Sequence, residues 1–255
     1  LDVIAYATIN GNGNEFIIAQ NNGNNLFSHV FTGIPLKYEY NSSDQFNDYI
    51  GFADLDNDGD NELIATGTDN NLYQYSYANG LSPTRKSLLT SSCCYARGSA
   101  GISVGDFNGD NRTDILLVGG AASEGSTRLL RNDGSSLFTN VAGSLPQFNH
   151  GNVHWGDYDN DGDLDFFVSG KLPSESSYKN EIYLNNGGSF SLALSATERL
   201  KDWIDYDGDG DLDILTREGN VLKNNGSTNW FLQAPYFIYI LQILITFALG
   251  VLLFC

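Results

Sequence analysis

The sequence of 255 residues contains no methionine and only three cysteines. The cysteines, at positions 93, 94 and 255, are too few for the disulfide framework that holds small secreted domains together. The neighbouring Cys93 and Cys94 could form a vicinal disulfide, pair outside the chain or remain thiols. Histidine is also scarce: none of the three lies in a recognisable catalytic motif, and no glycine-rich stretch is followed by the lysine and helix of a phosphate-binding loop. The sequence therefore favours a protein that is not an enzyme.

Basic residues are few as well, with 13 Lys and Arg against 31 Asp and Glu and a net charge of −18. Without a basic patch to hold phosphates, nucleic acid is excluded as a partner. Helical periodicity is missing until the C-terminal tail, whereas 28 Gly, 14 Tyr and 15 Phe suit short strands joined by tight turns. We therefore expect an all-β fold.

Four nine-residue segments carry oxygen donors at matching offsets and hold 18 of the 31 acidic residues. We call them loops one to four, number their positions one to nine, and place them at residues 54–62, 106–114, 157–165 and 205–213. Carboxylates this close repel one another unless a cation neutralises them, and Ca²⁺ prefers six to eight oxygen ligands. The loops therefore predict about four calcium sites.

The loops begin like the calcium loop of an EF-hand but do not continue as one. An EF-hand needs a bidentate glutamate at position twelve and a helix on either side. Position twelve is instead occupied by Ala65, Leu117, Val168 and Thr216, and the flanking sequence is typical of strands. The EF-hand is excluded, and the last acidic residue of each loop stands at position nine.

The ninth positions recur at intervals of 52, 51 and 48 residues, a period typical of propeller blades. In each repeat an apolar segment precedes the loop, an apolar run follows it, and a short strand ends in asparagine and glycine, a hairpin-turn signal. Leu1 and Asp2 match the end of a loop. The pattern therefore predicts that residues 1–35 form a partial blade and that the chain begins inside a metal loop.

These segments resemble the FG-GAP repeats of integrin alpha chains and the related VCBS repeats of secreted and cell-surface proteins. The resemblance is carried by residues 105–110, by residues 156–165 and by the Leu-x-Asn-x-Gly strands. It covers about residues 1–230 and implies a β-propeller of four-stranded blades, truncated at its N-terminus, with each Ca²⁺ held in a hairpin loop.

The resemblance also implies a set of ligands: side chains at positions one, three, five and nine, and a main-chain carbonyl at position seven. In loops one and two these are Asp54, Asp56, Asp58, Asp60, Glu62, Asp106, Asn108, Asp110, Arg112 and Asp114. In loops three and four they are Asp157, Asp159, Asp161, Asp163, Asp165, Asp205, Asp207, Asp209, Asp211 and Asp213. Loop two has an asparagine at position six, which tolerates left-handed backbone, so we expect its turn to be kept. Because loop two has the fewest charges, we expect it to be the weakest site.

Residues 236–255 form an uncharged apolar stretch. As a helix they would span roughly 30 Å, the thickness of a bilayer core. Because no basic residue follows, the stretch predicts either a transmembrane helix or a GPI-attachment signal. Both place the propeller on the extracellular face of the cell membrane. Glycosylation sequons lie at 41–43, 111–113 and 225–227, and we expect the one inside loop two to be unused.

Together these features predict a calcium-binding ectodomain for cell adhesion or ligand binding, in which Ca²⁺ has a structural role. Its expected partners are the membrane, through the tail, and an extracellular protein or glycan, through variable segments at 119–127 and 171–180. Two alternatives remain open: a carbohydrate-binding, lectin-like propeller, and a non-catalytic part of a larger secreted enzyme.

Overall fold

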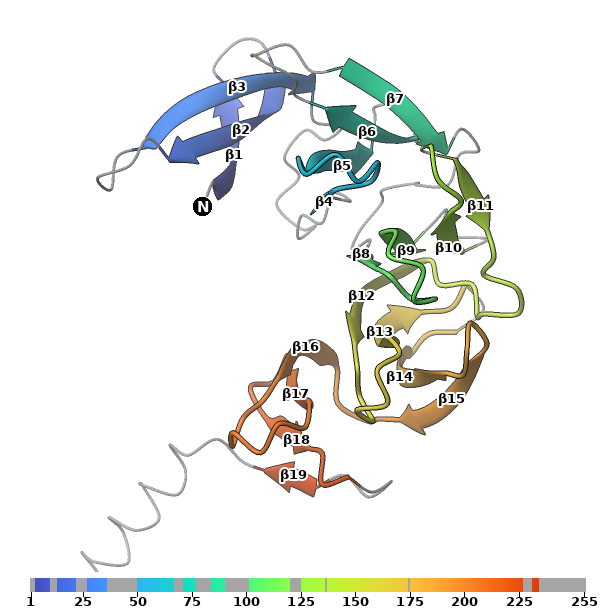
Figure 1. Ribbon diagram of the computed structural model, residues 1–255. Coiled ribbons are helices and arrows are strands. Elements are labelled where there is room, and N and C mark those ends of the chain that lie inside the picture. The colour runs from blue at the N-terminus through green and yellow to red at the C-terminus, as the bar shows by residue number, and fades with distance from the viewer. Residues whose placement is uncertain are drawn as a thin grey trace, which may run out of the picture. The chain divides into compact units, whose positions relative to one another are not determined.

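The computed structural model describes residues 3–9, 13–21, 27–35, 50–66, 71–76, 84–89, 101–119, 125–135, 137–173, 175–226 and 231–233. Within these ranges every regular element is a β-strand, and the strands form five antiparallel sheets (Figure 1). The expected all-β fold is confirmed. Cys93, Cys94 and the tail at 236–255 lie outside the described residues, and no helix among the described residues is long and apolar enough to cross a membrane.

The first sheet has three strands, which pair in sequence order: β1 (Val3–Ile9), β2 (Gly13–Asn21) and β3 (Phe27–Pro35). It occupies the segment for which we expected a partial blade. Each of the other sheets has four strands, again paired in sequence order, as the resemblance implies for a blade. Their bounds are β4 (Ile50–Ala53), β5 (Glu62–Thr66), β6 (Leu72–Ser76), β7 (Thr84–Leu89), β8 (Gly101–Gly105), β9 (Asp114–Val118), β10 (Thr127–Asn132), β11 (Phe138–Asn140), β12 (His150–Gly156), β13 (Asp165–Lys171), β14 (Tyr178–Asn185), β15 (Phe190–Ser195), β16 (Leu200–Ile204), β17 (Asp213–Thr216), β18 (Val221–Lys223) and β19 (Phe231–Gln233).

Each acidic loop joins the first two strands of a four-stranded sheet. Position nine is the first residue of the second strand, and the residue before position one ends the first strand or directly follows it. Ala53 pairs with Glu62 across loop one, Gly105 with Asp114 across loop two, and Ile204 with Asp213 across loop four. The strand register therefore closes each loop at its base, which fixes where its oxygen donors lie.

The chain divides into two compact units, one of residues 1–153 and 170–177 and the other of residues 154–169 and 178–255. In the first unit, buried apolar residues of two consecutive sheets pack together: Ala53, Leu55, Ile64 and Leu72 against Ile115, Leu117 and Leu130. In the second unit, Tyr158, Phe167 and Ile182 pack with Leu200, Ile214 and Leu222 of the next sheet. This packing brings loops one and two together in the first unit, and loops three and four together in the second.

Candidate metal centres

Each loop ends in a buried carboxylate at position nine, with an exposed fraction of 2% for Glu62 and 0% for the other three. In loop two, Asp114 Oδ1 accepts a hydrogen bond from the N–H of Asn132 at 2.7 Å, and its Oδ2 accepts one from the N–H of Phe107 at 3.1 Å. The same contacts recur elsewhere, from Asn185 and Tyr158 to Asp165, from Asn224 and Tyr206 to Asp213, and from Leu55 to Glu62. Where both bonds are made, the carboxylate ties the start of its loop to the end of the third strand.

Burial of these carboxylates makes their ionised form costly. Burial raises the pKa of Asp114 and of Asp165 to about 6, although the two N–H donors act in the opposite direction. Burial also raises the pKa of Glu62 and Asp213, and the other carboxylates of each loop add to the effect. A cation held nearby would favour the ionised form again, so the loops gain from a bound positive charge.

Positions four and six of every loop have left-handed backbone. Asn57, Asn111 and Asn160 stand at such positions with φ of 60°, 61° and 59°. The five glycines at the remaining positions have φ between 72° and 95°. Most side chains strain this conformation, whereas glycine and asparagine tolerate it, which is why only these two residues occur there. Asn111 keeps the turn at position six, as the sequence predicts.

Side-chain oxygens of each loop accept hydrogen bonds from the loop's own backbone and hold it in a compact turn. In loop one, Asp54 at position one accepts hydrogen bonds from the N–H groups of Asp58 and Gly59 at 3.1 Å and 2.9 Å. Asp106 and Asp157 make the same two bonds, whereas Asp205 accepts one from the N–H of Gly208. In all four loops the N–H of position seven donates to the carboxylate of position five.

This compact turn brings carboxylates together in three of the loops. One oxygen from each member of a set lies within 4.8 Å of the others, and the sets are Asp54, Asp56 and Asp58; Asp157, Asp159 and Asp165; and Asp205, Asp207 and Asp209. Oxygens that each lie 2.3–2.6 Å from one ion can be about this far apart, so the donor sets fit Ca²⁺. Among the described side chains, no lysine or arginine forms an ion pair with the sets in loops one and three. Within the part of the chain that the structure describes, these two loops therefore present carboxylates without a basic partner.

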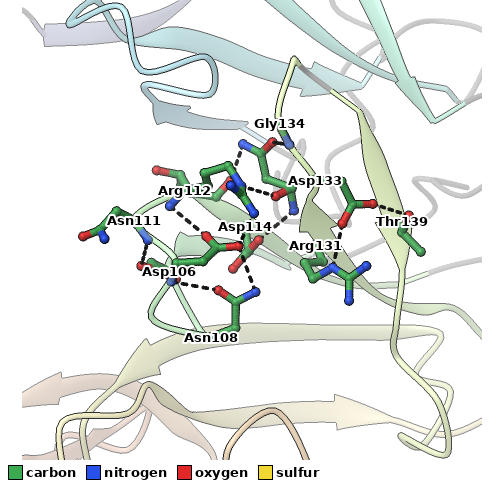
Figure 2. A network of polar contacts seen from close by, with 12 residues as sticks. Asp106, Asn108, Asn111, Arg112, Asp114, Arg131, Asp133, Gly134 and Thr139 are labelled. Atoms are coloured by element: carbon green, nitrogen blue, oxygen red, sulfur yellow. Dashed lines mark hydrogen bonds and ion pairs between the residues drawn. The ribbon is translucent and has the colours of Figure 1, made fainter.

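Loop two contains its own cation (Figure 2). Arg112 Nη2 lies 2.6 Å from Asp110 Oδ2, and Arg112 Nε donates to the carbonyl of Asn132 at 2.7 Å. Asn108 at position three also donates to Asp110, at 3.2 Å. We expected Arg112 to contribute only its main-chain carbonyl, but its guanidinium engages the carboxylate at position five.

Loop four contains a cation from outside the loop. Lys223, the last residue of β18, forms an ion pair with Asp207 at position three, and its Nζ lies 3.6 Å from Asp209 Oδ2 at position five. The bond from Lys223 lowers the pKa of Asp207. Although all five odd positions of this loop are acidic, a lysine already contacts two of the three convergent carboxylates.

Asparagine side chains connect consecutive loops within each unit. At position four, Asn57 Nδ2 donates to the carbonyl of Asn111 at 3.1 Å, and Asn160 Nδ2 donates to Asp211 Oδ1 at 2.8 Å. At the end of the third strand, the Nδ2 groups of Asn132 and Asn224 donate to the position-two carbonyls of the preceding loops, those of Leu55 and Tyr158. In each unit, two asparagine side chains therefore donate hydrogen bonds between consecutive repeats, one from position four of a loop and one from the end of the third strand.

A cavity of about 260 Å³ lies between loops three and four. Its lining includes Tyr158, Asp159, Asn160 and Asp211, together with Asn224 from the end of the third strand. Carboxylate and amide groups thus face an open space beside an aromatic residue.

The structure brings positions one, three and five together in loops one and four, and positions one, three and nine in loop three. Sequence reasoning missed the side chains of Lys223 and Arg112 as counter-charges, and it took the strand-end asparagines only as turn signals. Their recurrence in the Leu-x-Asn-x-Gly strands was the available indication that these asparagines have a second role.

Comparisons with known proteins agree with the repeat pattern. A family model described as FG-GAP-like repeat matches residues 54–117 and 106–168, which confirms the resemblance for the repeats that contain loops one to three. No curated protein matches the sequence.

Among solved structures, the chain is similar to an Agrocybe aegerita lectin that recognises non-reducing terminal N-acetylglucosamine. The identity is 20% and the TM-score 0.55, over 91% of this chain and 65% of the lectin chain. The chain thus spans less than two thirds of the lectin, and the likeness shows a common fold. A chain of the Photorhabdus luminescens Tc holotoxin pore also matches, with 14% identity and a TM-score of 0.39, over 91% of this chain and 11% of that one.

Proposed function

Because the chain carries FG-GAP-like repeats in a series of four-stranded sheets, we propose that it is a calcium-stabilised β-propeller that binds a ligand outside the cell. The observation that carries the proposal is the convergence of carboxylates in hairpin loops whose turns are already formed. Each loop supplies its own donors and closes on itself, which suits a structural ion better than a catalytic one with an open coordination position. The proposed role is binding and not catalysis.

The calcium part of the proposal is tested by thermal unfolding with Ca²⁺ and with EDTA. Chelation should lower the melting temperature sharply, because the loops lose the charge that offsets carboxylate repulsion. Asp159→Ala should weaken calcium binding at loop three and leave loop one unchanged, because these loops lie in different units. Identical melting curves in Ca²⁺ and EDTA would contradict the structural role of calcium.

We propose that the ligand is an extracellular protein, bound in adhesion, or a glycan. The lectin of common fold and the cavity between loops three and four support the glycan. Asp211 lines this cavity and its carboxylate accepts a hydrogen bond from Asn160, so it could accept sugar hydroxyls in the same way. Asp211 is also at position seven, where the implied metal ligand is the main-chain carbonyl, and replacing its side chain should spare calcium.

A glycan array in Ca²⁺ and in EDTA distinguishes the two ligand classes. For a glycan ligand, binding should appear in Ca²⁺, disappear in EDTA and be lost in Asp211→Ala. The matched control is Asp60→Ala, which changes position seven of loop one in the other unit and should keep glycan binding. An array without any bound glycan, together with adhesion of cells to the immobilised protein, would favour the protein ligand.

The apolar stretch at 236–255 supports a position on the extracellular face of the cell membrane, where millimolar Ca²⁺ would fill even modest sites. Treatment of expressing cells with a phosphatidylinositol-specific phospholipase distinguishes the two anchors. Release into the medium indicates a GPI anchor, and retention of a surface-exposed protein indicates a transmembrane helix. A protein that external protease cannot reach on intact cells would contradict the proposed location.

A further inference from the structure

Loops three and four differ in sequence only at position four, yet the strand beside them carries a different residue in each case. Both have aspartate at positions one, three, five, seven and nine. In both, the N–H of a strand-end asparagine, Asn185 or Asn224, donates to Oδ1 of position nine at 2.7 Å. The residues immediately before these asparagines are therefore equivalent, and they are Leu184 and Lys223.

Lys223 reaches the carboxylates that a metal ion would use. Its ammonium is paired with Asp207 and lies 3.6 Å from Asp209 Oδ2, and both residues belong to the convergent set of loop four. The Lys223 side chain is 28% exposed, so neighbouring atoms partly cover it. An ammonium paired with two of three convergent carboxylates neutralises part of their repulsion and competes with a metal ion for their oxygens.

Loop two has an equivalent arrangement built from a different residue. The guanidinium of Arg112, which is labelled in Figure 2, is fixed at two points, by Asp110 Oδ2 and by the carbonyl of Asn132. Position three is Asn108, whose amide also donates to Asp110. The guanidinium of Arg112 and the amide of Asn108 thus both donate to Asp110 Oδ2, the oxygen that position five would offer to a metal.

Building on the proposed calcium role, we propose that Lys223 and Arg112 take the place of the divalent cation in loops four and two, so that, of the four described loops, loops one and three are the ones that bind Ca²⁺. A tethered cation is always present at high effective concentration, and a metal ion must displace it before it can gain the carboxylates. Each compact unit then contains one metal-dependent loop and one loop whose carboxylates are neutralised by a lysine or arginine side chain.

The test is the number of calcium ions bound by the full chain, measured by isothermal titration and by terbium luminescence. Wild-type protein should bind two ions. Lys223→Leu, which gives loop four the residue found beside loop three, should bind three, whereas Lys223→Arg should still bind two. Lys86→Leu is the control for lost charge, because the ammonium of Lys86 donates to the carbonyl of Ser135 at 3.4 Å and forms no ion pair with a described loop carboxylate. This variant should still bind two ions.

A second readout does not depend on counting ions. In EDTA, Lys223→Leu should unfold at a lower temperature than wild type, and added Ca²⁺ should reduce or abolish this difference by filling loop four. If the leucine variant does not fold, the same measurement is made on Lys223→Gln, which keeps a hydrogen-bond donor. Arg112→Gln should add a weaker site in loop two.

The possible results separate this inference from the proposed function. Four ions bound by wild type, or two bound by a folded Lys223→Leu variant, would overturn the role of Lys223 and leave the calcium proposal intact. Three ions bound by wild type would overturn one of the two roles, and the variant that then adds no ion identifies which one. An Arg112→Gln variant without an added site would overturn the role of Arg112. If neither wild type nor Lys223→Leu bound Ca²⁺, the calcium role itself would be overturned, and this inference with it.

Discussion

The strand-end asparagine of the second four-stranded sheet offers the sharpest test of how these repeats are held together. Asn132 is 1% exposed, and its side chain makes three hydrogen bonds. Nδ2 donates to the carbonyl of Leu55 at 2.9 Å and to that of Thr113 at 3.2 Å, and Oδ1 accepts from the N–H of Gly134 at 3.0 Å. Asn132→Ala removes all three and leaves the carbonyl of Leu55 buried without this partner.

The size of the effect follows from these contacts. Each hydrogen bond contributes about 1 kcal/mol, and a buried carbonyl left without a partner costs about 1–3 kcal/mol more. Asn132→Ala should therefore lower the free energy of unfolding by roughly 4–6 kcal/mol. Asn224→Ala in the other unit removes two side-chain bonds, to Tyr158 and Gly226, so it should cost about 1 kcal/mol less.

Urea unfolding in saturating Ca²⁺, followed by circular dichroism, measures these differences. Hydrogen exchange then assigns the loss of protection to the unit that contains the substitution. The control is Asn186→Ala, which removes one exposed bond to Ser191 Oγ and should cost less than about 1 kcal/mol. If Asn132→Ala unfolds within 1 kcal/mol of wild type, the side-chain link between loops one and two has no energetic role and the reasoning is refuted.

Two further predictions concern pH and packing. In EDTA, acidification from pH 7.5 to 4 should raise the melting temperature, because Asp114 and Asp165 have a folded-state pKa of about 6, above the ordinary value of 3.8. This contribution is complete below the unfolded pKa and is lost as pH rises through 6. Saturating Ca²⁺ should weaken or reverse this rise in melting temperature on acidification. A metal-free melting temperature that falls as the pH is lowered from 7.5 to 5 would contradict the prediction. Gly101→Ala should destabilise the chain by about 1–3 kcal/mol, because the added Cβ would lie 2.8 Å from the Cα of Asn152. Gly51→Ala, whose Cβ would meet nothing closer than 3.5 Å, should change the free energy of unfolding by less than about 0.5 kcal/mol in the same urea titration. Equal losses in the two glycine variants would refute the packing argument.

The parts of the fold that depend on local sequence could be predicted from the sequence. Donors at alternate positions, with glycine or asparagine where φ is positive, specify the loop and the hairpin around it. Asn111 illustrates this, because its tolerance of left-handed backbone was sufficient to predict the turn. The resemblance to FG-GAP repeats then implied four-stranded sheets.

The contacts that decide the chemistry of each loop could not be predicted in this way. Lys223 follows Asp207 by 16 residues, and the two meet only because β18 pairs with β17 in a particular register. Arg112 stands inside the pattern, but its sequence position does not indicate whether its guanidinium turns toward Asp110 or toward solvent. Position nine was predicted as a ligand, whereas its second role, binding the N–H of an asparagine in the third strand, depends on the folded sheet.

The position-four asparagines couple consecutive repeats within each unit. Asn57 can donate to the backbone of loop two only while loop one keeps its left-handed turn, and Asn160 depends on loop three in the same way when it bonds Asp211. In each unit, the order of one hairpin is thus a condition for a contact made by the next. The stability of each repeat then depends partly on its neighbour, as in a one-dimensional array of repeats. Loss of an ion from loop one or three should therefore loosen two blades and not one.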